Sequence, residues 1–341
     1  MDTVLSVIDI SNPTAETVQK LYEAASTQGF VYIEGSEFAS DEVNEMFRLS
    51  KEFFSQPYDE KQTYAISEAN LGYSCMNREV LDPTEEQGDP KESCGRGANS
   101  TNRAFNFGQF KDDKAIQPLP PTFSRFEKDL ADFSKKCHAT CNKLLDLLAV
   151  ALKIDPALGG AEWFSSRHDL KQASGSILRF LYYPAVRSSD DENEIRAGAH
   201  TDYGSMTLLF QRAGEEGLEV LSPITNEWIG IPALQAKDSK SCPPIVVNIA
   251  DQLSFWSASV LKSAVHRVKF PLHQCRSGVD RYSMVYFCHP ADDTLLEPVP
   301  SPIVRSLDGE GANAVAKNGD DALTASEHLK RRLAAAYSWK K

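Results

Sequence analysis

The segment from Ser176 to Cys288 most constrains the fold, because it contains many short strand-like stretches with no helical pattern between them. Apolar, β-branched and aromatic residues dominate stretches such as SILRFLYY, MTLLFQ, PIVVNIA, LSFWS and RYSMVYFC. Parallel strands need long crossover connections, usually helices, whereas antiparallel strands can be joined by short turns. The sequence therefore predicts an antiparallel β-sandwich or barrel, with each of these stretches as a strand.

Helical segments are expected outside this region. Apolar residues repeat with a period of 3.6 over 121–154, which predicts a long helix bracing one face of a sheet. Residues 5–115 have a mixed α/β pattern, and within them 69–108 is rich in Gly, Asn, Asp, Pro and charges. A loop of that length is expected to be either a lid over a substrate site or a disordered insertion. A last helix is expected over 321–340. The predicted fold is α+β with a mainly β core over 172–292.

Charge and cysteine usage exclude several classes of function. The net charge is −12, so we expect neither nucleic acid nor an anionic membrane as a partner. No apolar run approaches the length of a membrane-spanning helix, and the N-terminus does not resemble a secretory signal. The seven cysteines are scattered, as free thiols in a reducing compartment would be, which predicts a cytoplasmic protein. The oligomeric state is not predicted.

Two polar residues, His200 and Asp202, stand two apart in AGAHTDYGS, next to a strand-like stretch. Alternate residues of a strand face the same side, so both would point into the interior, where unsatisfied polar groups are costly. His266, on another expected strand, supplies a third group. Two histidines and one carboxylate that leave other positions open form the metal triad of non-haem Fe(II) oxygenases. The alternative is a set of buried polar groups that only hydrogen-bond one another.

A second pair, Arg281 and Ser283, also stands two apart in the expected strand RYSMVYFC. An arginine that points into a barrel is a buried charge and needs an anionic partner. Its guanidinium can bind a carboxylate through two hydrogen bonds, and the serine hydroxyl can add a third. The alternative is that Arg281 pairs with one of the protein's own carboxylates.

Together with VIDIS, GFVYIEG, GDPKES, LYYP, GLEV and VVNIADQLSFWS, these motifs resemble the 2-oxoglutarate-dependent Fe(II) oxygenases of the isopenicillin-N-synthase-like family. Within that family, the amino-acid sequence of these motifs is most similar to fungal thymine-hydroxylase-like and secondary-metabolite oxygenases. The resemblance implies a distorted jelly roll (double-stranded β-helix). It also implies Fe(II) on the triad, and 2-oxoglutarate bound by Arg281, Ser283 and Tyr183. The family's asparagine two positions before that tyrosine is Leu181 here, which puts one hydrogen bond to the cosubstrate in doubt.

The implied activity is the oxidation of a small organic molecule, by hydroxylation, desaturation or ring rearrangement. Dioxygen would be consumed and 2-oxoglutarate would be decarboxylated to succinate, with ascorbate as a reductant. Two alternatives stay open. One is an oxidase of the same fold that does not use 2-oxoglutarate, and the other is a non-catalytic member that binds a metabolite.

Three residues are expected to contact the substrate. Arg179 shares a strand face with Tyr183, so its partner should be a substrate oxygen or a structural carboxylate. Tyr203 and Phe287 could hold a planar substrate between their rings, and the alternative is that both rings only fill the interior of the barrel. The other histidines are expected to be surface or packing residues, although His289, directly after VYFC, could line the mouth of the pocket.

Overall fold

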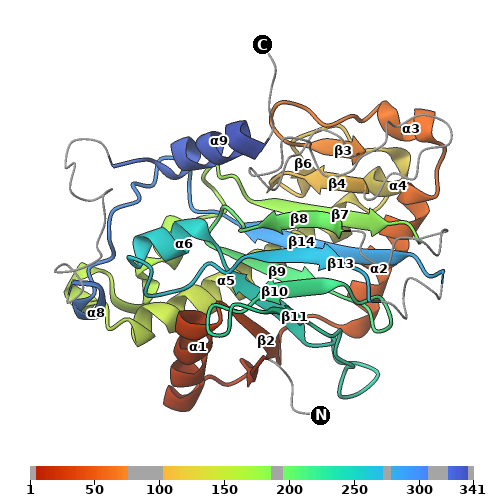
Figure 1. Cartoon of the computed structure of the whole chain (residues 1–341). Helices are drawn as coiled ribbons and strands as arrows, with labels where there is room; N and C mark the ends of the chain where they lie inside the picture. Colours follow the sequence, from red (N-terminus) through yellow and green to blue (C-terminus); the bar gives the residue numbers. More distant parts are fainter. Residues whose placement is uncertain (1–4, 76–102, 186–194, 272–277, 306–321, 337–341) are drawn as a thin grey trace.

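The computed structural model describes residues 5–75, 103–185, 195–271, 278–305 and 322–336. Two antiparallel sheets form the centre of the molecule (Figure 1). The larger sheet has eight strands, in the order β1 (Val7–Asp9), β2 (Phe30–Glu34), β12 (Ile245–Ile249), β9 (Met206–Phe210), β14 (Arg281–Cys288), β7 (Ile177–Tyr183), β4 (Arg103–Phe107) and β3 (Gly72–Cys75). The smaller has four: β11 (Trp228–Gly230), β10 (Leu218–Leu221), β13 (His266–Lys269) and β8 (Ile195–His200). The pairing of β1 with β2 is parallel and every other pairing in these two sheets is antiparallel. The predicted jelly roll is confirmed.

The central strand β14 separates the main core from the space between the sheets. Its even-numbered residues, among them Met284 and Tyr286, belong to the largest hydrophobic cluster of the protein. Its odd-numbered residues face the other way and line a cavity: Arg281, Ser283, Val285 and Phe287. The alternation expected of a strand therefore sends the polar RxS pair toward the cavity and the large apolar residues toward the core.

Helices cover the core face of the larger sheet. The longest is α5 (Glu127–Ala151), which packs against β9 and β14 through fully buried residues such as Leu130, Phe133 and Leu144. Beside it are α1 (Ala15–Thr27), which contacts α5, and α2 (Ser40–Phe54), which contacts β7 and β14. The bracing helix expected over 121–154 is thus present, but it begins as a separate turn, α4 (Pro121–Ser124). Phe126, with ψ of 26°, interrupts the helical geometry between the two.

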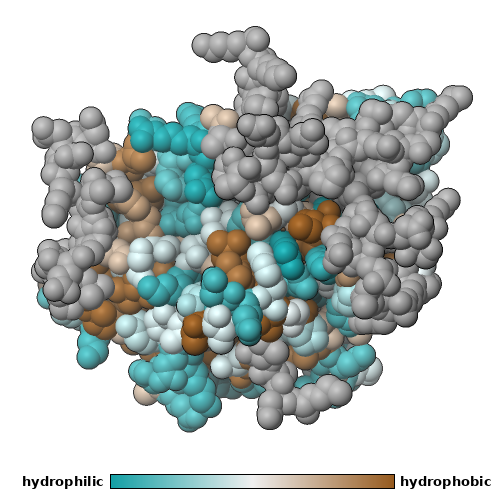
Figure 2. Space-filling model, in the orientation of Figure 1, coloured by the Kyte–Doolittle hydropathy of each residue, from teal (hydrophilic) through white to brown (hydrophobic). Residues whose placement is uncertain are grey.

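The remaining elements are short. They are α3 (Tyr58–Gln62), the β5–β6 hairpin (Phe110–Lys111 and Lys114–Ala115), three 3-10 turns (Pro156–Leu158, Gly160–Trp163 and Ser165–Arg167), α6 (Asp251–Trp256), α8 (Pro302–Arg305) and α9 (Ala325–Ala336). In the described part of the chain no helix is both long and apolar enough to cross a membrane. On the face shown in Figure 2, apolar residues lie in small groups between polar ones, as on an ordinary solvent-exposed surface.

One predicted strand is wrong. The stretch LSFWS lies in helix α6, because Leu253 and Trp256 are three residues apart and both are fully buried, which is a helical spacing. Trp256 packs against Trp163 and Phe164, with ring centroids 5.6 and 5.7 Å away. An acidic residue, Asp251, occupies the first turn, where it favours the helix.

The expected lid segment, 69–108, is only partly a loop. Both of its ends form strands, β3 and β4, which pair with each other at the edge of the larger sheet. Residues 76–102 lie outside the described residues. The final helix, expected over 321–340, is α9 over Ala325–Ala336, and it lies above the strands in Figure 1.

Candidate functional site

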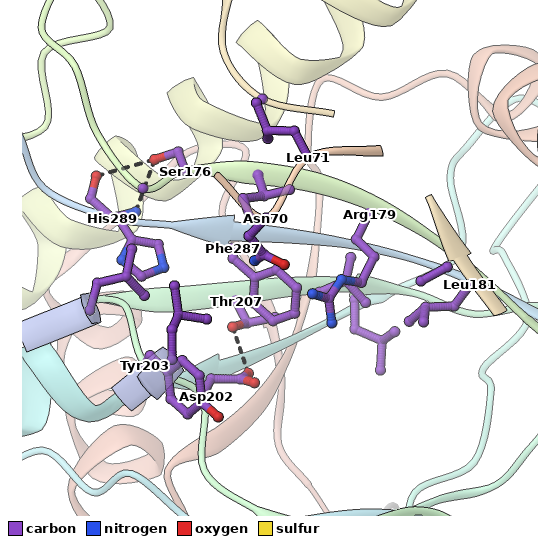
Figure 3. A pocket seen from close by; sticks show the side chains of 18 of the residues that line it. Asn70, Leu71, Ser176, Arg179, Leu181, Asp202, Tyr203, Thr207, Phe287 and His289 are labelled. Atoms are coloured by element: carbon purple, nitrogen blue, oxygen red, sulfur yellow. Dashed lines mark hydrogen bonds between the residues drawn. The ribbon is translucent and has the colours of Figure 1, made fainter. Parts of the chain in front are cut away.

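A cavity of about 510 Å³ lies between the two sheets. Its wall includes the cavity-facing residues of β7 and β14, the end of β8, the start of β13, and two leucines of α9, Leu329 and Leu333. All nine residues singled out in the sequence as site residues line it (Figure 3 draws several of them). The fold therefore brings the metal-ligand candidates, the RxS pair and the substrate-contact candidates into one space.

The two histidines and the aspartate converge at one end of this cavity. His200 ends β8 and His266 begins β13, and the antiparallel pairing sets them directly opposite each other. The Nε2 atoms of His266 and His200 lie 3.6 and 3.9 Å from Oδ1 of Asp202. One possible ligand atom from each residue falls within 4.8 Å of the others. Because β8 ends at His200, the irregular segment after the strand, rather than strand alternation, brings Asp202 to this position.

Hydrogen bonds orient all three side chains. Nδ1 of His200 lies 2.7 Å from the carbonyl of Gly198, and Nδ1 of His266 lies 3.1 Å from the carbonyl of Ala264. A carbonyl can only accept, so each Nδ1 carries a proton, and in the neutral ring Nε2 then has its lone pair free for a metal ion. Without a metal ion, burial alone would lower the pKa of His266, but Asp202 raises this pKa, because the carboxylate favours the charged ring. This donor set, two neutral imidazoles and a carboxylate, fits Fe(II) with positions left open.

Asp202 is buried and held by neighbours that sequence reasoning did not find. Its Oδ2 accepts hydrogen bonds from Thr207 Oγ1 at 2.6 Å and from Asn248 Nδ2 at 2.8 Å, which turns Oδ1 toward the histidines. Burial alone would raise the pKa of this carboxyl, but His266, His200 and the hydrogen bond from Thr207 hold the pKa well below its usual range. The carboxylate is therefore ionised, as a metal ligand must be.

The second group of the cavity is Arg281, which is only 2% exposed. Its guanidinium donates to the carbonyl of Glu215 at 3.1 Å, to Ser283 Oγ at 3.2 Å and to Gln211 Oε1 at 3.4 Å. It also lies over the ring of Tyr183, 5.0 Å from the centroid. Burial lowers the pKa of Arg281, because the charged form is desolvated.

The alternative of an internal ion pair finds no support in the described residues, where Arg281 makes hydrogen bonds only to neutral groups. The carboxylate of Glu215 pairs with Arg212 at 3.0 Å and accepts from the backbone N–H of Tyr282 at 2.6 Å, although its charge and that of Glu216 still favour the charged form of Arg281. A buried guanidinium with no direct ion pair among the described residues suits an anion that enters the cavity.

The substrate-contact candidates Arg179, Tyr203 and Phe287 also line the cavity. Nε of Arg179 donates to the amide oxygen of Asn106 at 2.7 Å, and the guanidinium lies over the ring of Phe287, 5.2 Å from the centroid. Asn106 in turn donates to Asn70. The contacts of Arg179 thus include an amide and an aromatic ring, and a substrate oxygen or a structural carboxylate as its partner stays a prediction. Leu181, at the family's asparagine position, contributes an apolar surface.

Helix α9 contributes to the site in a way that the sequence did not predict. Arg332 forms an ion pair with Asp251 at 3.0 Å and donates to Thr201 Oγ1 at 3.1 Å. Its guanidinium lies 4.8 Å from the ring centroid of Tyr203. Thr201 and Tyr203 flank Asp202 in sequence, so α9 packs directly on the segment that carries the candidate metal ligand.

A jelly roll with two histidines and one carboxylate, and with open positions beside them, defines the class of non-haem Fe(II) oxygenases. Comparison with known proteins supports this class. A family model for the N-terminal region of non-haem dioxygenases in morphine synthesis matches residues 5–116. The model of the 2OG-Fe(II) oxygenase superfamily matches residues 174–290, where the candidate site lies.

Similar proteins agree with these matches. A UPF0676 protein of Schizosaccharomyces pombe is 33% identical over 304 residues, which is 86% of this chain and 84% of the relative. The 2-oxoglutarate-dependent dioxygenase traH of Penicillium crustosum is 26% identical and covers 81% of this chain and 78% of its own. The crystal structure of a full-length Neurospora crassa protein in complex with alpha-KG and thymine has a TM-score of 0.76 at 27% identity, covering 98% of this chain and 97% of that one.

The chain belongs to the 2OG-Fe(II) oxygenase superfamily. It is an oxygenase that uses Fe(II) and 2-oxoglutarate, as the sequence motifs predicted.

Proposed function

We propose that His200, Asp202 and His266 hold the Fe(II), and that Arg281 and Ser283 bind the far carboxylate of 2-oxoglutarate. The observation that carries this assignment is that one cavity holds both the triad and a buried arginine that pairs with no carboxylate of the described residues. When bound, the metal and the keto acid supply the oxidising chemistry. The chain's own residues orient the ligands, exclude water and offer the carboxylate a charged, bidentate partner. Tyr183, beneath the guanidinium, fixes the position of Arg281 and contacts the cosubstrate.

We further propose that the substrate is a small planar organic molecule. Three observations support this: the cavity is of ligand size, its wall is largely apolar, and two aromatic side chains, Tyr203 and Phe287, reach it. The Neurospora crassa structural neighbour was solved with thymine, and thymine is therefore a suitable first probe. The fungal relatives fit a role in the biosynthesis of secondary metabolites. The oxidative step would be hydroxylation, desaturation or ring rearrangement of such a molecule.

The role of Arg179 is tested by Arg179→Ala. If this guanidinium contacts the substrate, losing a charged hydrogen-bond donor should raise the dissociation constant for thymine at least about tenfold. The affinity for 2-oxoglutarate should stay as in the unaltered protein. Both constants can be measured by calorimetry with the anaerobic Fe(II) enzyme.

Arg103→Ala is the matched control, because Arg103 also lies over an aromatic ring, that of Tyr182 at 5.6 Å, but it does not line the cavity. A lower melting temperature of Arg179→Ala with unchanged thymine binding would assign Arg179 to the scaffold, through its contact with Asn106.

A further inference from the structure

His289 directly follows β14, and its ring points into the cavity, in line with the expectation that it could line the pocket (Figure 3). The residue is 5% exposed, and what remains open faces this space. Two glycines leave room for the ring. A Cβ added to Gly204 would lie 2.9 Å from the ring atoms Cδ2 and Nε2, and one added to Gly175 would lie 3.3 Å from Cγ and Nδ1. The imidazole therefore packs closely between the backbone segments that contain Gly175 and Gly204.

The backbone of His289 is fixed as well. Its N–H donates to Ser176 Oγ at 3.0 Å, and the same hydroxyl donates to its carbonyl at 3.2 Å. Ser176 begins the approach to β7, so this reciprocal pair ties the end of β14 to the neighbouring strand. The ring thus projects from a rigid position, as a residue that discriminates between ligands requires.

The ring nitrogens of His289 differ from those of the other buried histidines. His138 and His168 use both ring nitrogens in hydrogen bonds within the core, and His200 and His266 use Nδ1 on backbone carbonyls. Neither ring nitrogen of His289 has a hydrogen bond within the described residues. Because the ring lines the cavity, its donor and its acceptor are available to a ligand there.

Burial, with a smaller contribution from His168, lowers the pKa of His289 to about 3. The ring is then neutral at neutral pH, with one N–H that donates and one nitrogen that accepts. Such a group matches an uncharged polar edge of a ligand better than a carboxylate or an ammonium group. Figure 3 draws Arg179 and His289 on opposite sides of the Phe287 ring, and all three residues line the same cavity.

We propose that His289 is a specificity-determining residue that hydrogen-bonds an uncharged polar edge of the substrate, at the end of the cavity away from Arg179. This proposal rests on the oxygenase function proposed above. It narrows the substrate class to uncharged planar molecules with hydrogen-bonding groups on two separate edges. An apolar ring of the same size would fit the space but leave His289 unsatisfied.

The test compares two probes of similar shape, thymine and toluene, in the anaerobic Fe(II) enzyme with 2-oxoglutarate bound. His289→Leu keeps an apolar side chain at this position and removes both nitrogens. It should weaken thymine binding at least about fivefold and leave toluene binding unchanged or tighter. His289→Gln restores a donor and an acceptor and should recover most of the thymine affinity.

Three results would overturn the proposal: unchanged thymine affinity in His289→Leu, an equal loss for both probes, or no thymine binding by unaltered protein that binds 2-oxoglutarate. An equal loss would mean that His289 only shapes the cavity. The affinity for 2-oxoglutarate is measured in parallel for each protein. If the unaltered protein fails to bind 2-oxoglutarate, it is the proposed function that fails, and this outcome is separate from the three above.

Discussion

Replacing Asp202 by alanine should lower turnover at least about a hundredfold and remove most of the bound iron. Asp202 is the only anionic group of the triad, and it lies within 4 Å of the Nε2 atoms of His200 and His266. Without it, two neutral imidazoles remain, which bind a divalent ion far more weakly. The iron content of the purified variant and its rate of succinate formation are the two measurements.

The fold should survive this change, because the triad holds a cofactor rather than the core. The substitution leaves Thr207 Oγ1 and Asn248 Nδ2 without their shared acceptor, a cost of about 1–3 kcal/mol. His200→Ala is the companion variant, since the side chain of His200 is partly exposed. Full activity of either variant under limiting iron would contradict the assignment of these residues as iron ligands.

The second large effect is expected for Arg281→Ala. Its guanidinium is the charged partner proposed for the far carboxylate of 2-oxoglutarate, and a charge-assisted bidentate contact is worth roughly 1.5–3 kcal/mol. The variant should therefore need at least about tenfold more 2-oxoglutarate for half-maximal rate, while its iron content stays unchanged. Steady-state rates over a range of 2-oxoglutarate concentrations give the result.

Two further variants separate charge from geometry at this position. Arg281→Lys keeps the charge but loses the planar fork, so its 2-oxoglutarate requirement should fall between those of the unaltered protein and Arg281→Ala. Ser283→Ala removes one neutral hydrogen bond and should have the smallest effect. An unchanged requirement in Arg281→Ala would mean that Arg281 only serves its contacts with Gln211 and Glu215.

Much of this site could be predicted because strand alternation is a local rule. Arg281, Ser283 and Phe287 share one face of β14, and Arg179, Leu181 and Tyr183 share one face of β7, as their spacing indicated. The rule failed where the chain leaves a strand. LSFWS looked like a strand because the aromatic residues Phe255 and Trp256 are typical of strands, and only the burial of Leu253 and Trp256 reveals the helix.

Contacts between distant segments gave no sequence signal. Thr207 and Asn248 orient Asp202 from two neighbouring strands, and neither residue type is diagnostic of a metal site. The packing of α9 on the metal segment joins Arg332 to Asp251 and Thr201, across a large separation along the chain. The role of His289 depends on two glycines and a serine from other segments, which a reading of single motifs does not connect.

The most direct measurement is the release of carbon dioxide and succinate from 2-oxoglutarate by the purified protein, with and without Fe(II) and with thymine as probe. We expect one succinate for each carbon dioxide released, only when iron is present. We also expect the activity to be lost in Asp202→Ala and to need more 2-oxoglutarate in Arg281→Ala. Oxygen consumption by the iron-loaded protein without succinate would instead indicate an oxidase of the same fold. If the iron-loaded protein consumes no oxygen and forms no succinate at saturating 2-oxoglutarate, this result contradicts the assignment as an oxygenase.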